Sequence, residues 1–255
     1  QNQRVGNLIP YSKKFLDKNF VFYLLYSLKR EIEKEAYGGA QPNISAIKIE
    51  ALNTTLAPLP FQRAIVLKIE NLFASLDKGI ADLKSAQEQL KVYRQAVLKK
   101  AFEGKYETRS IQEVCENVKV GIVIKPTKFY SKEKTGIVAF RSANVREFRI
   151  EDSNWIYFTK EGNEENKRTQ LKLGDVLIVR SGYPGTSCIV TEKYVGANAI
   201  DILIATPDSR IITSKFLCAF NNSPLGKGLF DEGAQGVAQK HLNVGVYGKL
   251  KMPVP

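Results

Sequence analysis

The sequence has few of the residues that build metal sites and disulfide frameworks. Its 255 residues include three cysteines and one histidine. Cys115, Cys188 and Cys218 show no CxxC spacing, so we expect neither a zinc site nor a disulfide framework. Long apolar runs are also missing, since stretches such as 20–26 and 199–205 fall far short of the ~20 residues that a membrane helix needs. No charged and then apolar leader opens the chain, and we expect a cytoplasmic protein with no membrane partner.

The composition is that of a folded protein with an excess of positive charge. Apolar residues make up 44% of the chain and charged residues 25%, and the formal net charge is +12. The excess is spread along the chain rather than held in one basic tail. It favours a polyanionic partner through counterion release, although ordinary solvated surfaces can also be basic.

Two parts of the chain repeat one another. Residues 38–45 match residues 236–243, and the same register continues as far as Leu52, which matches Leu250. A similar register aligns Phe20 with Phe216. We therefore expect the end of one module, a connector, and a second and nearly whole module. A chain that opens inside a module is expected to be part of a longer protein.

The connector has the periodicity of one long helix. Pro58 and Pro60 predict its start and Gly104 its end, which gives ~44 residues and a length of about 65 Å. Apolar residues recur at spacings of three, four and seven at Ile65, Ile69, Leu72, Leu76, Ile80, Leu83, Leu90, Tyr93 and Val97. Such a stripe is typical of a coiled-coil strut and needs a partner helix.

The flanking segments predict an α+β fold class. We expect a strand at 4–9, a helix capped by Asp17 and continuing through Ile32, and a short helix at 45–52. Beyond the connector we expect helices near 110–116 and 214–221, and strands near 120–124, 137–141, 155–158, 176–180, 188–190 and 200–205. The predicted domains are residues 1–60, 61–105 and 106–255.

Several motifs resemble those of one known family, the specificity subunits of Type I restriction-modification enzymes. Residues 58–66 (PLPFQRAIV) resemble the start of that family's central conserved helix, and residues 93–104 (YRQAVLKKAFEG) resemble its end. Residues 140–145, 173–182 and 238–242 are similar to landmarks inside its target recognition domains.

The resemblance implies a non-catalytic subunit that reads double-stranded DNA. In that family, two target recognition domains of opposite orientation are joined by two antiparallel helices, and each domain reads one half of a split sequence. The implied protein partners are DNA methyltransferase (modification) subunits and restriction subunits, and no cofactor is implied. The front of the first domain and the second helix have no counterpart in this sequence.

Two loops have side chains suited to reading bases or gripping phosphates. Arginine can grip guanine, and asparagine or glutamine can grip adenine, in the major groove. The first loop offers Arg141, Ser142, Asn144 and Arg146. The second offers Arg180, Ser181, Tyr183 and Thr186, and its glycines let backbone amides approach a phosphate. A polar turn and a hairpin turn are the simpler alternatives.

Three further places are weaker candidates for DNA contacts. Near the C-terminal glycines these are Gln239, Lys240 and His241, and in the first module they are Gln41 and Asn43. Lys125 and Lys128 begin a lysine-rich run that suits either a backbone clamp or a solvated loop.

Catalytic motifs are scarce. The sequence has no Walker motif, no glycine-rich cofactor loop and no paired metal-ligand spacing. Residues 165–167 (ENK) are the nearest fragment to a nuclease motif, but they lack a strand and an upstream acid. The alternatives to a DNA reader are a coiled-coil adaptor that binds proteins and a metal-dependent nuclease.

Overall fold

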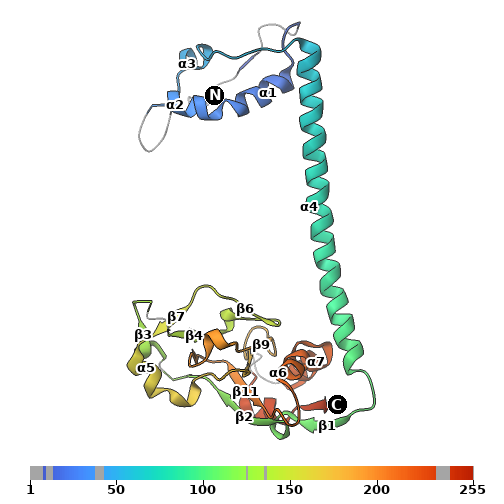
Figure 1. The fold of residues 1–255 in the computed structure, drawn as a ribbon, viewed down its shortest axis with the longest axis vertical. Coiled ribbons are helices and arrows are strands. Elements are labelled where there is room, and N and C mark those ends of the chain that lie inside the picture. Colours follow the sequence, from blue (N-terminus) through green and yellow to red (C-terminus); the bar gives the residue numbers. More distant parts are fainter. Residues whose placement is uncertain are drawn as a thin grey trace. The chain divides into compact units, whose positions relative to one another are not determined.

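The computed structural model describes residues 8–9, 14–37, 43–124, 126–134, 137–233 and 242–254. They fall into two units, residues 1–88 and 89–255, which share one long helix. The expected α+β class is confirmed, because short strands and short helices accompany the long helix (Figure 1).

The first unit contains three short helices, α1 (Lys18–Ser27), α2 (Lys29–Glu35) and α3 (Ala46–Glu50). The Asp17 carboxylate accepts hydrogen bonds from the amides of Asn19 and Phe20, which satisfies two of the free donors at the start of α1. The expected continuous helix through Ile32 is wrong, because the chain breaks at Leu28 between α1 and α2. The hydrophobic period runs through this break, so apolar spacing alone could not show it.

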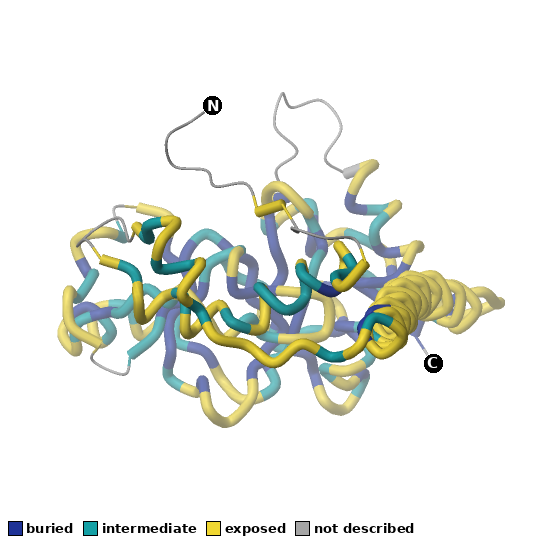
Figure 2. The backbone as a smooth tube through the Cα atoms, turned by 90° about the horizontal axis from the view of Figure 1, so that it is seen from above, coloured by how far each residue is buried: buried dark blue, intermediate teal, exposed yellow. Residues whose placement is uncertain are grey.

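The long helix α4 (Leu59–Phe102) confirms the expected connector. It has 44 residues, and the amides of Phe61 and Gln62 bond to the carbonyl oxygen of Pro58 at its start. Figure 2 shows that most of its length is exposed. The predicted apolar stripe is largely open to solvent, with Leu76 58% and Leu83 73% exposed.

The start of α4 is fixed by a buried glutamine. The Gln62 side chain is fully buried and donates to the carbonyl oxygens of Phe15 at 2.8 Å and Ala57 at 2.7 Å. Its Oε1 accepts from the Asp17 amide at 2.9 Å. One amide side chain therefore links the beginning of α4 to the cap of α1.

The second unit is built around two four-stranded sheets. The first has the order β2-β11-β8-β9 with antiparallel pairs, and the second has the order β10-β4-β7-β3. A further pair joins β1 (Glu107–Ser110) to β12 (Lys251–Val254), and β5 pairs with β6 in a hairpin. The remaining strand bounds are β2 Cys115–Val120, β3 Tyr130–Ser131, β4 Val138–Phe140, β5 Val145–Arg146, β6 Arg149–Ile150, β7 Ile156–Phe158, β8 Val176–Ile178, β9 Ser187–Ile189, β10 Asn198–Ala199 and β11 Leu203–Pro207.

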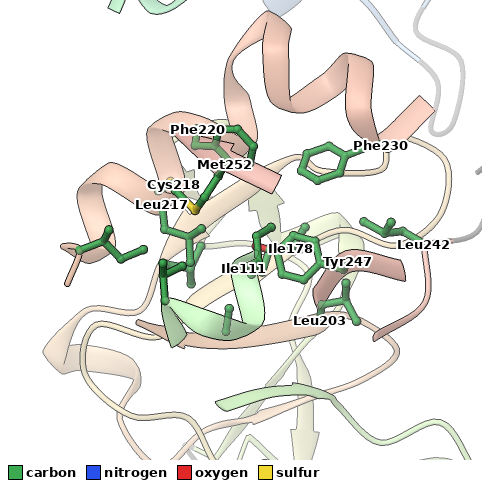
Figure 3. Close-up of a cluster of buried hydrophobic side chains, with 14 of the residues drawn as sticks. Ile111, Ile178, Leu203, Leu217, Cys218, Phe220, Phe230, Leu242, Tyr247 and Met252 are labelled. Carbon is green, nitrogen blue, oxygen red and sulfur yellow. The ribbon is translucent and has the colours of Figure 1, made fainter. Parts of the chain in front are cut away.

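The sheet β2-β11-β8-β9 contributes side chains to a hydrophobic core on each of its faces. Successive side chains of a strand point to opposite faces, and here they enter different cores. Val176 and Ile178 join a core formed with α6 (Ser214–Asn222), α7 (Pro224–Gly233) and α8 (Val244–Lys249). Leu177 joins a second core with Phe140 of the other sheet. Figure 3 shows the first of these cores, in which Phe220, Phe230 and Tyr247 are all buried.

The expected repeat is visible in the helix caps of the two units. Thr213 caps α6 as Asp17 caps α1, and Asn243 caps α8 as Ser45 caps α3. These cap pairs fall in the two registers that the sequence predicts. The glycine segments that anchored the match lie outside the described residues.

Other expectations need correction. The strand expected at 120–124 lies earlier, at β2, since Glu116 and Asn117 can face solvent on this edge strand; Ile122 forms only an isolated bridge. The helix expected near 110–116 is one 3₁₀ turn, Ile111–Glu113. Leu8 and Ile9 form no strand, and residues 4–7 of that prediction lie outside the described ranges. Helices α5 (Lys160–Glu165) and α7 are not among the expected elements.

Candidate nucleic-acid interface

The two polar loops predicted to contact DNA line the same groove. The groove encloses about 470 Å³ on the second unit. Its walls come from the segment after β4 and the turn between β8 and β9. The lining residues are Ser142, Val145, Arg146, Glu147, Val179, Ser181, Tyr183 and Thr186. Five of the predicted contact residues are among them.

Asn144 fixes the shape of the first wall. It is fully buried, its Oδ1 accepts from the Arg141 amide at 3.1 Å, and its Nδ2 donates to the carbonyl oxygens of Glu151 at 3.2 Å and Ser153 at 2.8 Å. The whole amide group is thus used inside the loop. In this conformation Asn144 is placed to hold the loop and is not presented to a ligand.

The two arginines near the first wall differ in exposure: Arg141 is partly buried and Arg146 is exposed. Arg141 donates from Nη2 to the carbonyl oxygen of Asn154 at 2.8 Å, while its buried Nε has no hydrogen-bond partner within the described part of the chain. Arg146 is exposed and lines the groove. Its Nη1 donates to the carbonyl oxygens of Val145 at 3.0 Å and Ser142 at 3.3 Å, which leaves further guanidinium donors for a ligand.

The first wall ends in a tight hairpin. Arg146 and Arg149 are paired, and Glu147 and Phe148 form the turn. Phe148 has a φ of 62°, which is uncommon for a residue with a Cβ atom. Its amide donates to the carbonyl oxygen of Ser187 at 2.9 Å, which ties the hairpin to β9. Such strain persists only where surrounding contacts enforce it, and it is concentrated at functional sites.

The second wall is a turn that requires two glycines. Gly182 and Gly185 have φ values of 84° and 87°, which glycine adopts without steric cost. The Gly185 amide donates to the carbonyl oxygen of Val179 at 3.0 Å, and the Phe230 ring packs against this glycine. Tyr183 stands at the tip of the turn and is 83% exposed. A rigid turn therefore presents one large aromatic ring.

Arg180 anchors the second wall from behind. It is only 8% exposed, and its Nη1 forms an ion pair with Asp201 at 2.6 Å. Its Nε donates to the carbonyl oxygen of Leu242 at 3.1 Å. This predicted contact residue is therefore placed to position the turn, whereas Ser181, the next residue, lines the groove.

The remaining predicted contacts are not brought to this groove. Lys128 lies 3.5 Å from the Glu165 carboxylate and 4.2 Å above the Phe129 ring centre. Asn43 pairs with Tyr37 through two backbone bonds and accepts the Ile44 amide on its side chain. Gln41, Lys125, Gln239, Lys240 and His241 lie outside the described residues.

Cys188 of β9 packs in the same core as the lining residues Val145 and Val179. Burial raises the pKa of the nearby Cys188 to about 12, so this thiol stays protonated. Across the described ranges, no three histidine, cysteine, aspartate or glutamate residues cluster closely enough to hold a metal ion. None of the helices in those ranges is long and apolar enough to cross a membrane.

Sequence reasoning missed one polar lining residue, Glu147. An acidic residue next to Arg146 carries no sequence signal of a DNA contact. The hairpin turn places Glu147 in the lining of the groove.

The chain is similar in sequence to Type I specificity subunits. Residues 1–84 match the family model of the Type I restriction modification DNA specificity domain. The Type I restriction enzyme EcoBI specificity subunit of Escherichia coli is 23% identical over 100% of this chain and 58% of its own length. The predicted resemblance to Type I specificity subunits is thereby confirmed.

One further specificity subunit and two solved structures are also similar to this chain. The EcoKI specificity subunit of Escherichia coli strain K12 is 24% identical over 66% of this chain and 39% of its own length. The crystal structure of the HsdS subunit from Thermoanaerobacter tengcongensis has a TM-score of 0.63 at 17% identity, covering 95% of this chain and 59% of that one. A structure from work on complex assembly of the type I R-M system has a TM-score of 0.65 at 18% identity, covering 96% and 60%. The chain thus spans less than two thirds of the length of these relatives.

Proposed function

We propose that the chain is a sequence-specific DNA-binding part of a Type I specificity subunit. It reads part of a bipartite target in double-stranded DNA and scaffolds the methyltransferase and restriction subunits in the cytoplasm. The observation that carries the proposal is the groove, where Ser142, Arg146, Ser181 and Tyr183 from two separate loops converge. Hydrogen-bond donors on a rigid scaffold are what base readout needs.

The overall charge supports the same proposal. A protein with a net charge of +12 gains affinity for DNA when its lysines and arginines release counterions from phosphates. This contribution is independent of sequence. Discrimination would come from a few base contacts, each contributing about 1–3 kcal/mol.

We propose that residues 1–60 are the C-terminal part of a first target recognition domain, 61–105 the spacer helix and 106–255 a second recognition domain. The matching caps of α1 with α6 and of α3 with α8 support this division. In the second unit, α6 and α8 pack on a sheet. In the first unit, the corresponding helices line an open groove of about 290 Å³ with a mainly apolar lining. That apolar face would be covered by the rest of the first domain.

We propose no catalytic role for this chain. The candidate interface is suited to hydrogen bonding with DNA, while methylation and cleavage would belong to the partner subunits. The ENK fragment supports no nuclease, since Glu165 ends helix α5 and its carboxylate pairs with Lys128.

The exposed stripe on α4 also fits a second candidate, a coiled-coil adaptor that binds only proteins. Leu72, Leu76, Leu83 and Leu90 are each more than half exposed. A partner helix would cover them in either function. Only DNA binding separates the two candidates.

The test is the affinity of the purified chain for duplex DNA as a function of salt. A DNA reader should lose affinity steeply, with a slope of log K against log salt of about −0.9 for each phosphate contact. Arg146→Ala should weaken binding to a selected sequence about 5- to 150-fold. Arg109→Ala is the matched control, because Arg109 lies in β1, outside the groove lining, and its side chain is partly exposed. Weak binding at every salt concentration would favour the adaptor, and metal-dependent cutting would favour the nuclease.

A further inference from the structure

The candidate groove contains one side chain of the wrong charge for a simple phosphate clamp. Glu147 is the one acidic residue among the described residues that line it. The other polar residues of the lining can all donate hydrogen bonds; they are Ser142, Arg146, Ser181, Tyr183 and Thr186. An ionised carboxylate can only accept them.

Both residues of the hairpin turn make contacts outside the hairpin. Glu147 forms an ion pair with Lys227 of α7, and both side chains remain partly exposed. The next residue, Phe148, has a positive φ and donates its amide to Ser187 of β9. Contacts to α7 and to β9 therefore fix a strained hairpin tip at the groove.

A carboxylate at this position is unfavourable for binding phosphates, because it repels them. The ion pair with Lys227 offsets part of that repulsion. A carboxylate at this position favours DNA binding only if it accepts a hydrogen bond from a donor on the DNA. Only the base edges provide such donors.

The major groove presents few donors. Cytosine exposes the N4 amino group and adenine the N6 amino group, whereas guanine and thymine expose acceptors and a methyl group there. A carboxylate can therefore accept from cytosine or adenine and is repelled by guanine O6 or thymine O4. We infer that Glu147 is a specificity-determining residue that accepts a hydrogen bond from the exocyclic amine of a cytosine or adenine. This inference rests on the proposed DNA-reading function.

The experiment is selection from a randomised duplex library with the whole chain, followed by affinity measurements on single-base variants of the selected sequence. We expect one position at which cytosine or adenine is required, and the enriched base will distinguish the two. Replacing that base pair with one that presents guanine or thymine should weaken binding about 5- to 150-fold. In Glu147→Gln, whose amide both donates and accepts, most of this preference should disappear while the other positions keep theirs.

Two further variants separate base reading from a structural role. Glu161→Gln is the matched control, because Glu161 is exposed on α5 and lies outside the groove lining. Lys227→Met removes the ion pair and leaves the carboxylate, so it should lower overall affinity but keep the preference for an amine at that position. The midpoint of thermal unfolding, measured for each variant, tests whether the fold is retained.

The outcomes are distinct. Loss of the preference in Glu147→Gln alone supports the inference. If Glu147→Gln keeps the wild-type preference, the inference is wrong even though the protein reads DNA. If the wild-type chain enriches no sequence at all, the proposed function fails and the inference fails with it.

Discussion

Arg180 and Asp201 form an ion pair of 2.6 Å directly behind the second wall of the candidate groove. Asp201 has a φ of 49°, so the backbone accepts an unfavourable conformation where it meets the arginine. The same guanidinium also holds the carbonyl oxygen of Leu242. One buried side chain thereby joins three separate segments of the second unit.

Arg180→Met is expected to lower the free energy of unfolding by about 2 kcal/mol, because hydrogen bonds from a buried charged group are lost. Urea unfolding measures the change. Arg109→Met should change stability by less than about 1 kcal/mol, since its ion pair with Glu107 is exposed. An unchanged stability in Arg180→Met, with uniformly weaker DNA binding, would instead make Arg180 a phosphate contact.

Gly185→Ala should be far more harmful than Gly182→Ala. Both positions have positive φ values, and this alone costs an alanine about 1–2 kcal/mol. At Gly185 the new Cβ would also lie 2.0 Å from the Phe230 ring, whereas at Gly182 it has, apart from its chain neighbours, no atom of the described residues within 4 Å. We expect Gly185→Ala to lower the unfolding free energy by about 3 kcal/mol or more, measured by urea denaturation. Equal effects of the two changes would show that the Phe230 ring moves freely.

Gln62→Leu should loosen the first unit. The change leaves the carbonyl oxygens of Phe15 and Ala57 and the amide of Asp17 without their partner. Each unsatisfied buried group costs about 1 kcal/mol or more. Hydrogen exchange at the amides of Asp17 and Phe20 should become faster, whereas Gln87→Leu, at an exposed position of α4, should leave it unchanged. Unchanged exchange in Gln62→Leu would mean that α1 is held by its apolar contacts alone.

Cys188 should resist thiol reagents in the folded protein. Burial raises its pKa to about 12, so the reactive thiolate is scarce at pH 8. With Cys115 and Cys218 replaced by serine, we expect labelling of Cys188 to be at least ~100-fold slower in buffer than in denaturant. Since the pKa is raised in the folded state, this group stabilises the fold below its unfolded pKa of about 8.5, and the contribution is lost as the pH rises toward 12. Rapid labelling of the folded protein would contradict this description of the core.

The parts of the fold that could be predicted are those fixed by local rules. Pro58 and Gly104 bracket α4, and a side-chain oxygen at residue 17 caps α1, so both features follow from the sequence. The break at Leu28 could not be predicted, because the apolar spacing continues through it. The position of β2 could not be predicted, because the exposed polar residues Glu116 and Asn117 interrupt the apolar alternation of this edge strand.

The candidate site was predictable in composition but not in geometry. The two loops were identified from their arginine, serine and glycine residues, yet nothing local indicates that they line one groove. Their approach depends on pairing between distant strands and on the bond from Phe148 to Ser187. The same tertiary contacts decide that Asn144 and Arg180 are buried, whereas Arg146 and Tyr183 face the groove.

Because Asn144 and Arg180 lie beneath the groove and not on its surface, loop shape and loop chemistry are governed by different residues. Substitutions at Ser142, Arg146 or Tyr183 can alter which hydrogen bonds the groove offers without reaching the buried network that sets the backbone. New preferences can therefore arise through a few surface changes on an unaltered frame. The fold therefore tolerates substitutions at the lining positions, which are the positions that would change DNA preference.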